Sequence, residues 1–258
     1  MGGNGASKSS GISVRCIKDY DSVASSSSSS AASSSSVEVL PPCKTETEDN
    51  CEYDTLTDDR DGRTYKTVKI GNQIWMAENL NYAYLQSTEN MDSTSFCYDN
   101  DPANCDKYGR LYIWAAAMDS AGLLNDDAKG CGYDVDCSPK FPVQGVCPSG
   151  WHLPNQAEWL TLYSTVGSKS LALEALKSQN GWCNNSNGTD AFGFSGLPAG
   201  YGYEGSYGSF KNNGCYAVFW TSTGNNRWYA NYEELYYEKE YLSSGNKLYS
   251  FSIRCVKN

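Results

Sequence analysis

The sequence predicts an α+β fold in which short strands and a few helices are joined by long loops. Apolar and polar residues alternate along 61–82, which is typical of strands. Apolar residues recur at helical spacing along 105–124 and again along 153–167. From residue 181 onward, glycine and aromatic residues are frequent and long apolar runs are absent. The chain has 258 residues, enough for one large domain or two small ones.

The stretch DGRTYKTVKIGNQIWMAENLNY, residues 61–82, is expected to form a β-hairpin. Gly71-Asn72 suits a two-residue II′ turn, because glycine accepts the positive φ of the first turn position. One face would carry Thr67, Lys69 and Gln73, and the other mainly Val68, Ile70, Ile74 and Met76.

Two principal helices are expected. In CDKYGRLYIWAAAMDSAGLL, residues 105–124, the residues at helical spacing are Leu111, Trp114, Ala115 and Met118. In LPNQAEWLTLYSTVG, residues 153–167, Asn155 can cap the helix while Glu158 reaches back to it. The apolar face of this helix would be Trp159, Leu162, Tyr163 and Val166. A short third helix is expected over 170–178, and strands around CYAVFWTST, RWYANYEEL and LYSFSIRCVKN.

The chain carries nearly the same phrase near both ends. Ser13–Lys18 matches Ser252–Lys257 without gaps, with four identical residues of six, and 22–36 is almost entirely serine and alanine. We therefore expect four segments: a C-terminal remnant of an upstream repeat at 1–20, a Ser-rich flexible linker at 21–42, an acidic lead-in bracketed by cysteines at 43–57, and one module at 58–258. A truncated amino terminus would also explain why no signal peptide is recognisable in MGGNGASKSSG.

Composition excludes several classes of partner. The net charge of −10 argues against nucleic acid, because binding phosphates needs clustered lysines and arginines. No window approaches 18 consecutive apolar residues, so no membrane span is expected.

Eleven cysteines point to an oxidising compartment, and hence to an extracellular or cell-surface location. No Cys-x-x-Cys pair occurs and His152 is the single histidine, which disfavours a zinc site. Setting Cys16 aside with the repeat remnant leaves ten cysteines, an even number. Cys43 and Cys51 bracket an acidic loop that a local disulfide could close.

A series of blocks in chain order resembles the Fibrobacter succinogenes major paralogous domain: DGRTYKTVKIGNQIWMAENLNY, YDNDPANCDKYGRLYIWAAAM, GVCPSGWHLPNQAEWLTLY, TDAFGFSGLPAGY, FWTST and FSIRCVKN. The block WHLPNQAEW is also similar to the RLPTEAEW segment of the formylglycine-generating-enzyme group. These resemblances imply a disulfide-stapled C-type-lectin-like module, with a small twisted antiparallel sheet, two main helices and a long loop-rich region.

That topology pairs the terminal strands, so the resemblance implies a core partner for Cys255, for which Cys147 is the candidate. Cys97–Cys105 and Cys131–Cys137 would then close short loops, and Cys183–Cys215 would staple the loop-rich region. These pairings are hypotheses, because connectivity does not follow from sequence alone.

The segment CYDNDPANCD offers one candidate metal site. Asp99, Asp101 and Asp106 supply oxygen ligands of the kind that calcium prefers. EF-hand spacing fails here, and the alternative is a polar turn closed by Cys97–Cys105 with an aspartate capping the next helix. No other cofactor is expected.

No catalytic constellation is recognisable. His152 lies in an apolar setting that favours packing, and no Gly-x-Ser-x-Gly motif accompanies it. The active cysteine pair of the formylglycine-generating enzymes belongs to a longer motif that has no counterpart here, and Cys255 in IRCVK has a structural setting. A non-catalytic protein is therefore expected.

Exposed aromatic side chains are the remaining candidates for ligand binding, although each could instead belong to the core. The candidates are Tyr201, Tyr203, Tyr207, Trp228, Tyr229 and Tyr232. The Glu-Pro-Asn, Gln-Pro-Asp and Trp-Asn-Asp triplets of calcium-dependent lectins are absent, so calcium-bridged sugar binding is not expected. Polysaccharide is the leading hypothesis for the ligand, a surface protein is the second, and an enzyme of the formylglycine-generating type is the third.

Overall fold

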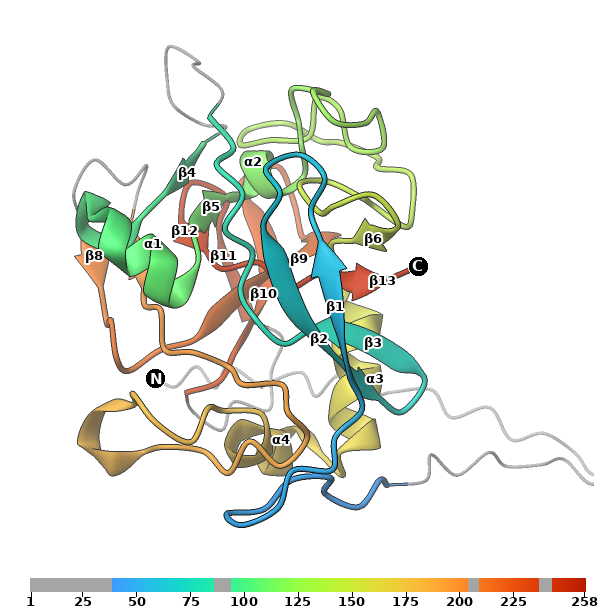
Figure 1. The fold of residues 1–258 in the computed structure, drawn as a ribbon. Coiled ribbons are helices and arrows are strands. Elements are labelled where there is room, and N and C mark those ends of the chain that lie inside the picture. Colours follow the sequence, from blue (N-terminus) through green and yellow to red (C-terminus); the bar gives the residue numbers. More distant parts are fainter. Residues whose placement is uncertain (1–38, 86–93, 204–208, 237–242) are drawn as a thin grey trace, which may run out of the picture. The chain divides into compact units, whose positions relative to one another are not determined.

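The computed structural model describes residues 39–85, 94–203, 209–236 and 243–258, and it shows a mixed α/β fold with three antiparallel sheets (Figure 1). The first sheet has the order β1 (Tyr53–Thr57), β2 (Thr64–Ile70), β3 (Gln73–Met76), β13 (Val256–Lys257) and β6 (Trp151–His152). The second consists of β11 (Ser243–Asn246), β10 (Tyr229–Glu234) and β9 (Val218–Gly224). The third has the order β4 (Ser95–Phe96), β5 (Leu111–Ile113), β12 (Ser250–Phe251), β7 (Tyr201–Gly202) and β8 (Phe210–Lys211).

The helices are few and short. They are α1 (Pro102–Tyr108), α2 (Trp114–Ala117), α3 (Gln156–Thr165) and α4 (Lys169–Ala175), with 3-10 turns η1 (Tyr98–Asn100) and η2 (Cys183–Asn185). The expected α+β class is confirmed, but three sheets replace the one small sheet. The described residues also contain one ten-residue helix and shorter ones, where two main helices were expected.

The expected hairpin is present, with Ile70 paired to Gln73 across the turn and φ of 62° at Gly71. Its faces differ from the prediction. Val68 pairs with Trp75 and Lys69 pairs with Ile74, and paired residues project from the same side of a sheet. Ile74 therefore shares the face of Lys69, and by the same pairing Met76 shares the face of Thr67 and Gln73 that of Ile70. The prediction grouped Ile74 with Val68 because it ignored the two turn residues, which change the register.

The predicted helix over 105–124 is wrong. The chain ends α1 at Tyr108, turns at Gly109 with φ of 75°, and then forms the buried strand β5 and the four-residue α2. A side chain at position 109 would place its Cβ 2.6 Å from Cβ of Asn79, so a close tertiary approach forces the break. Residues of β5 are buried on both faces, and that pattern imitates helical spacing.

The predicted helix at 153–167 is confirmed as α3, and its first turn is capped as expected. Asn155 Oδ1 accepts a 3.1 Å hydrogen bond from the Glu158 amide, and Glu158 Oε2 accepts one of 2.8 Å from the Asn155 amide. The expected apolar face of α3 is buried, and α4 lies within the expected 170–178 apart from its first residue.

The core is largely aromatic. Helix α3 lies behind the β2–β3 hairpin (Figure 1). Its Trp159 packs on Trp75, Phe194 and Phe219 with ring centroids 4.8–5.9 Å apart. These large rings compensate for the scarcity of long aliphatic runs.

The C-terminal phrase SIRCVK has buried structural roles. Arg254 is fully buried, and its guanidinium donates to Asn79 Oδ1 at 2.6 Å and to the carbonyls of Met76, Phe194 and Ser195. Burial lowers the pKa of Arg254, and these hydrogen bonds satisfy its donors. Ser252 accepts from Asn79 Nδ2 at 3.3 Å. The matching phrase at 13–18, and the expected repeat remnant and most of the linker, lie outside the described residues.

Five disulfides join all ten cysteines of the described segments. The pairs are Cys43–Cys51, Cys97–Cys105, Cys131–Cys137, Cys147–Cys255 and Cys183–Cys215. They are the same five pairs that the sequence hypotheses named. Cys16 lies outside the described residues.

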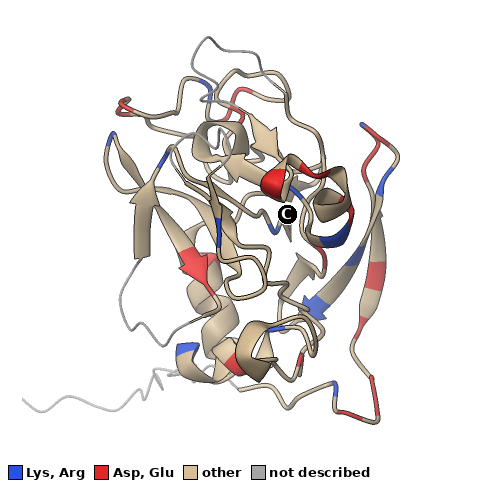
Figure 2. Cartoon of the chain, turned by 90° about the vertical axis from the view of Figure 1, so that its left-hand side faces the viewer, with Lys and Arg blue, Asp and Glu red and all other residues tan. Residues whose placement is uncertain are grey.

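Charge is distributed without a dominant sign on the face shown in Figure 2, where basic and acidic segments are interspersed. Among the described helices, none is long and apolar enough to span a membrane.

Candidate functional site

A cavity of about 380 Å³ lies between two loops, and we name it the aromatic cleft. One loop connects β9 to β10, and the other runs from the Cys131–Cys137 disulfide to Phe141. The lining residues are Trp114, Val135, Asp136, Cys137, Pro139, Phe141, Thr223, Gly224, Asn225, Asn226 and Lys247.

The two loops are joined by hydrogen bonds around Asp134. Its amide donates to the carbonyl of Arg227 at 2.7 Å, and Arg227 Nη2 returns a 3.1 Å bond to the carbonyl of Asp134. The Asp134 carboxylate lies 2.7 Å from Arg227 Nε and accepts a 2.8 Å hydrogen bond from the indole of Trp228. Together with the disulfide, these bonds hold the cleft walls in one arrangement.

The turn between β9 and β10 is shaped by Asn226. Its Oδ1 accepts hydrogen bonds from the amides of Trp228 and Tyr229, at 2.8 and 2.9 Å. Asparagine favours this local turn because its short side chain reaches the backbone two and three residues on. The turn therefore places Trp228 and Tyr229 next to the cleft in the chain, with both rings more than 40% exposed.

Lys247 forms the floor of the cleft and is only 2% exposed. Its ammonium lies 4.3 Å from the ring centroid of Trp114 and donates to the carbonyls of Gly132 and Val135, at 3.0 and 3.4 Å. Burial lowers the pKa of Lys247, and the nearby Asp136 carboxylate partly opposes this shift. The two carbonyls and the Trp114 ring therefore hold this ammonium in place beneath the cleft.

Large apolar side chains are exposed around this cleft. Phe141 is 58% exposed, Val135 is 42% exposed, and Trp228 and Tyr229 stand on the adjoining turn. Asp136, Asn225 and Asn226 contribute polar groups to the same cavity lining. Such a surface offers flat apolar faces beside hydrogen-bonding groups, which suits a ligand with both kinds of surface.

The six aromatic candidates from the sequence do not form one surface. Trp228 and Tyr229 belong to the cleft turn, whereas Tyr201 and Tyr203 are half-buried and pack against Tyr249 at 6.4 and 4.9 Å. Tyr232 is also half-buried, with its ring 5.0 Å from that of Phe251. Tyr207 lies outside the described residues.

The three aspartates proposed for calcium lie near one another in the chain but have other roles. Asp101 Oδ1 caps α1 by accepting from the Ala103 amide at 3.0 Å. Asp106 is exposed on α1, 3.8 Å from Arg63, and Asp99 lies in η1 with φ of 54°. Among the described residues, no group of three or more His, Cys, Asp or Glu side chains is arranged to hold a metal. Calcium binding stays a prediction.

His152 is held between two fixed partners. Its Nδ1 lies 2.6 Å from Asn258 Oδ1, and its Nε2 lies 2.6 Å from Glu158 Oε1. Burial lowers the pKa of His152, but the Glu158 hydrogen bond and charge outweigh it, so the pKa is raised above its ordinary value. Since Glu158 also caps α3, this pair connects β6 to that helix.

Sequence reasoning missed Phe141, Lys247 and Trp114 as cleft residues. Trp114 was assigned to a helix face, and Lys247 lies more than 100 residues away from the carbonyls that it binds. The one available signal was the Cys131–Cys137 pair, which marked a constrained loop just before an exposed phenylalanine.

The fold defines a disulfide-bonded α+β module, and the cleft gives it a cavity with exposed aromatic side chains. The model of the Fibrobacter succinogenes major domain matches residues 68–257, and the chain belongs to this family. The resemblance seen in the sequence is thereby confirmed. No curated protein and no solved structure matches the chain.

Proposed function

We propose that this protein is a non-catalytic, secreted or cell-surface module of C-type-lectin-like fold that binds polysaccharide in the aromatic cleft. The observation that carries the proposal is the exposure of Phe141 in a cavity that Asn225 and Asn226 also line, with Trp228 exposed on the adjoining turn.

Sugar rings have C–H faces that stack on aromatic rings and hydroxyls that both donate and accept hydrogen bonds. The cleft lining includes aromatic faces, the Asp136 carboxylate as an acceptor, and the side-chain NH₂ groups of Asn225 and Asn226 as donors. Because the Asp134 hydrogen bonds already order the walls, binding loses little conformational entropy.

Two observations support the proposed fold and location. β13, at the end of the chain, pairs with β3 through Val256 and Trp75, so the beginning and end of the matched domain share a sheet. Five disulfides favour an oxidising compartment such as the cell exterior.

A protein partner is the second candidate. Val135 and Phe141 are exposed on the same loop and could form the centre of an apolar interface. The enzyme hypothesis has no comparable support, because all ten cysteines of the described segments are in disulfides.

The test is sedimentation of the full chain with insoluble cellulose and with xylan, with and without a calcium chelator. We expect binding that survives the chelator and is reduced at least tenfold by Phe141→Ala, since stacked rings dominate such contacts. The matched control is Leu171→Ala, which removes a similarly exposed apolar side chain from α4.

Binding lost to the chelator would favour the calcium hypothesis at Asp99, Asp101 and Asp106. Failure to bind either polymer would contradict the polysaccharide proposal and favour a protein partner.

A further inference from the structure

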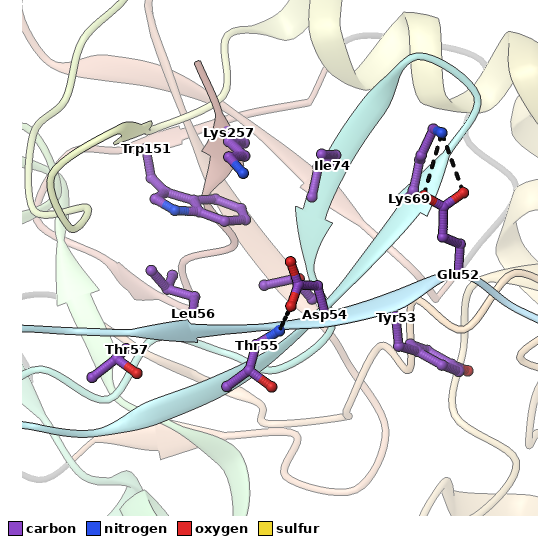
Figure 3. A pocket seen from close by; sticks show the side chains of 11 residues that line it. Glu52, Tyr53, Asp54, Thr55, Leu56, Thr57, Lys69, Ile74, Trp151 and Lys257 are labelled. Carbon is purple, nitrogen blue, oxygen red and sulfur yellow. Dashed lines mark hydrogen bonds and ion pairs between the residues drawn. The ribbon is translucent and has the colours of Figure 1, made fainter.

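A second cavity, of about 340 Å³, lies on one face of the first sheet, and we name it the sheet-face pocket (Figure 3). It is lined by residues of β1, β2, β3, β6 and β13 and by Glu52. It shares no lining residue with the aromatic cleft.

The pocket occupies one part of a sheet face whose other part, at Leu56 and Met76, is covered by the core. Val68 and Trp75 face the aromatic core beneath, whereas Lys69 and Ile74 face the pocket. Strand β1 then extends the sheet beyond β2 through five paired residues, from Tyr53↔Val68 to Thr57↔Thr64.

The lead-in at residues 43–57, which contains β1, is attached to the rest of the module by an ion pair and by backbone hydrogen bonds. Lys44 makes a 2.6 Å ion pair with Asp190, which is nearly fully buried, and the amides of Cys43 and Lys44 both donate to the carbonyl of Ala191. The Cys43–Cys51 disulfide closes the loop between these contacts and β1. Because the family match begins at residue 68, the β1 wall of this pocket precedes the matched stretch.

The groups that face the cavity combine apolar surface with unpaired polar atoms. Trp151, Leu56 and Ile74 supply the apolar part (Figure 3). Asp54 points inward, and its Oδ1 accepts a 2.8 Å hydrogen bond from the Thr55 amide. Within the described part of the chain, the Lys257 ammonium and the Trp151 indole N–H have no protein partner, so both can donate to a ligand.

The charges of the pocket balance. Glu52 and Lys69 form a 3.2 Å ion pair at one end, and Asp54 and Lys257 supply one further charge of each sign. A charged ligand would therefore meet as many like charges as opposite charges, and the pocket would not attract it by net charge. A neutral molecule rich in hydroxyls instead satisfies both the acceptor at Asp54 and the donors at Lys257 and Trp151.

We propose that the sheet-face pocket is a second binding site, and that its ligand is a neutral saccharide. Its volume lies at the small end of the range for small-molecule sites, which suits one or two sugar rings rather than a long chain. The proposal does not depend on the aromatic cleft. If both sites bind, one module holds two points of a polysaccharide, and the linked sites raise the avidity.

The test is a titration of the ¹⁵N-labelled full chain with cellotetraose and with xylotetraose, followed by NMR of the indole N–H resonances. Trp151 reports on the sheet-face pocket, and Trp228, whose indole is bonded to Asp134, reports on the cleft. We expect the Trp151 resonance to move in saturable fashion with at least one of the two sugars.

Asp54→Ala is expected to raise the sugar concentration at half-saturation of the Trp151 shift about tenfold, because it removes a charged hydrogen-bond acceptor. The matched control is Asp126→Ala, which removes an exposed carboxylate from a residue outside the lining of this pocket. Phe141→Ala, in the cleft, should leave the Trp151 titration unchanged.

The proposal is overturned if the Trp151 resonance stays in place at millimolar concentrations of both sugars, or if Asp54→Ala and Asp126→Ala titrate alike. Movement of Trp228 alone would support polysaccharide binding at the cleft and reject this second site. Movement of the Trp151 resonance alone would support the sheet-face pocket and reject polysaccharide binding at the aromatic cleft. The two proposals can therefore be contradicted independently of each other.

Discussion

The indole N–H of Trp228 donates a 2.8 Å hydrogen bond to the carboxylate of Asp134, which lies 94 residues earlier in the chain. This bond joins the β9–β10 turn to the Cys131–Cys137 loop and orients the exposed indole ring that adjoins the aromatic cleft. The same carboxylate binds Arg227, so one aspartate fixes two neighbouring side chains.

Replacing Asp134 by alanine should therefore affect binding more than stability. Both members of the Asp134–Arg227 pair are about half exposed, and such pairs contribute only about 0–1 kcal/mol to unfolding. Polysaccharide binding should fall severalfold as Trp228 loses its orientation. Binding isotherms and thermal melts of Asp134→Ala test this. Asp126→Ala, which breaks the exposed Lys129 pair, is the control and should bind normally.

The Cys147–Cys255 disulfide should contribute most to stability among the five. It spans 108 residues, and in the chain-entropy model a loop of that size contributes about 4–5 kcal/mol. Cys43–Cys51 spans only eight residues and should contribute about 2–3 kcal/mol. Denaturant unfolding of the two double Cys→Ser variants measures the difference. Equal losses would contradict the entropic account.

Arg254 is predicted to tolerate no substitution that removes its charge. Arg254→Met leaves Asn79 Oδ1 and up to three buried carbonyls without their donor, at a cost of about 3–5 kcal/mol. The control is Lys257→Met, three residues later on an exposed position. Denaturant midpoints of the two variants should differ strongly. Similar midpoints would show that the buried network is dispensable.

His152 should make the fold more stable at mildly acidic pH than above neutrality. Its folded-state pKa is raised above 6.5 by Glu158, so the native state binds the proton more tightly than the unfolded chain does. This stabilisation is fully present below pH 6.5 and is lost as the pH rises through the raised folded-state value.

Unfolding free energies measured from about pH 5.5 to about pH 8.5 test this dependence. Glu158→Gln should flatten the profile, because the glutamine keeps the size of the side chain and removes its charge. Glu174→Gln on α4 is the control and should retain the slope. A wild-type profile without any slope in this range would exclude the role assigned to Glu158.

Several features followed from local sequence because their causes are local. Gly71 gave the hairpin turn, and Asn155 with Glu158 gave the start of α3, since each depends on residues within a few positions. The family could also be recognised from quoted blocks along the chain. Periodicity failed at 105–124, where a buried strand between two short helices produced the same apolar spacing as one long helix.

The sequence by itself determined the α+β class, the main capped helix and the wealth of cysteines that make the fold disulfide-bonded. Only the tertiary structure decided which aromatic rings are exposed. Trp228 and Tyr232 lie four residues apart with similar composition around them, yet one stands in the cleft turn and the other packs on Phe251. Burial of a ring depends on what distant segments place above it. Sequence near the ring carries little of that information, and for this reason the two pockets could be found only in the folded chain.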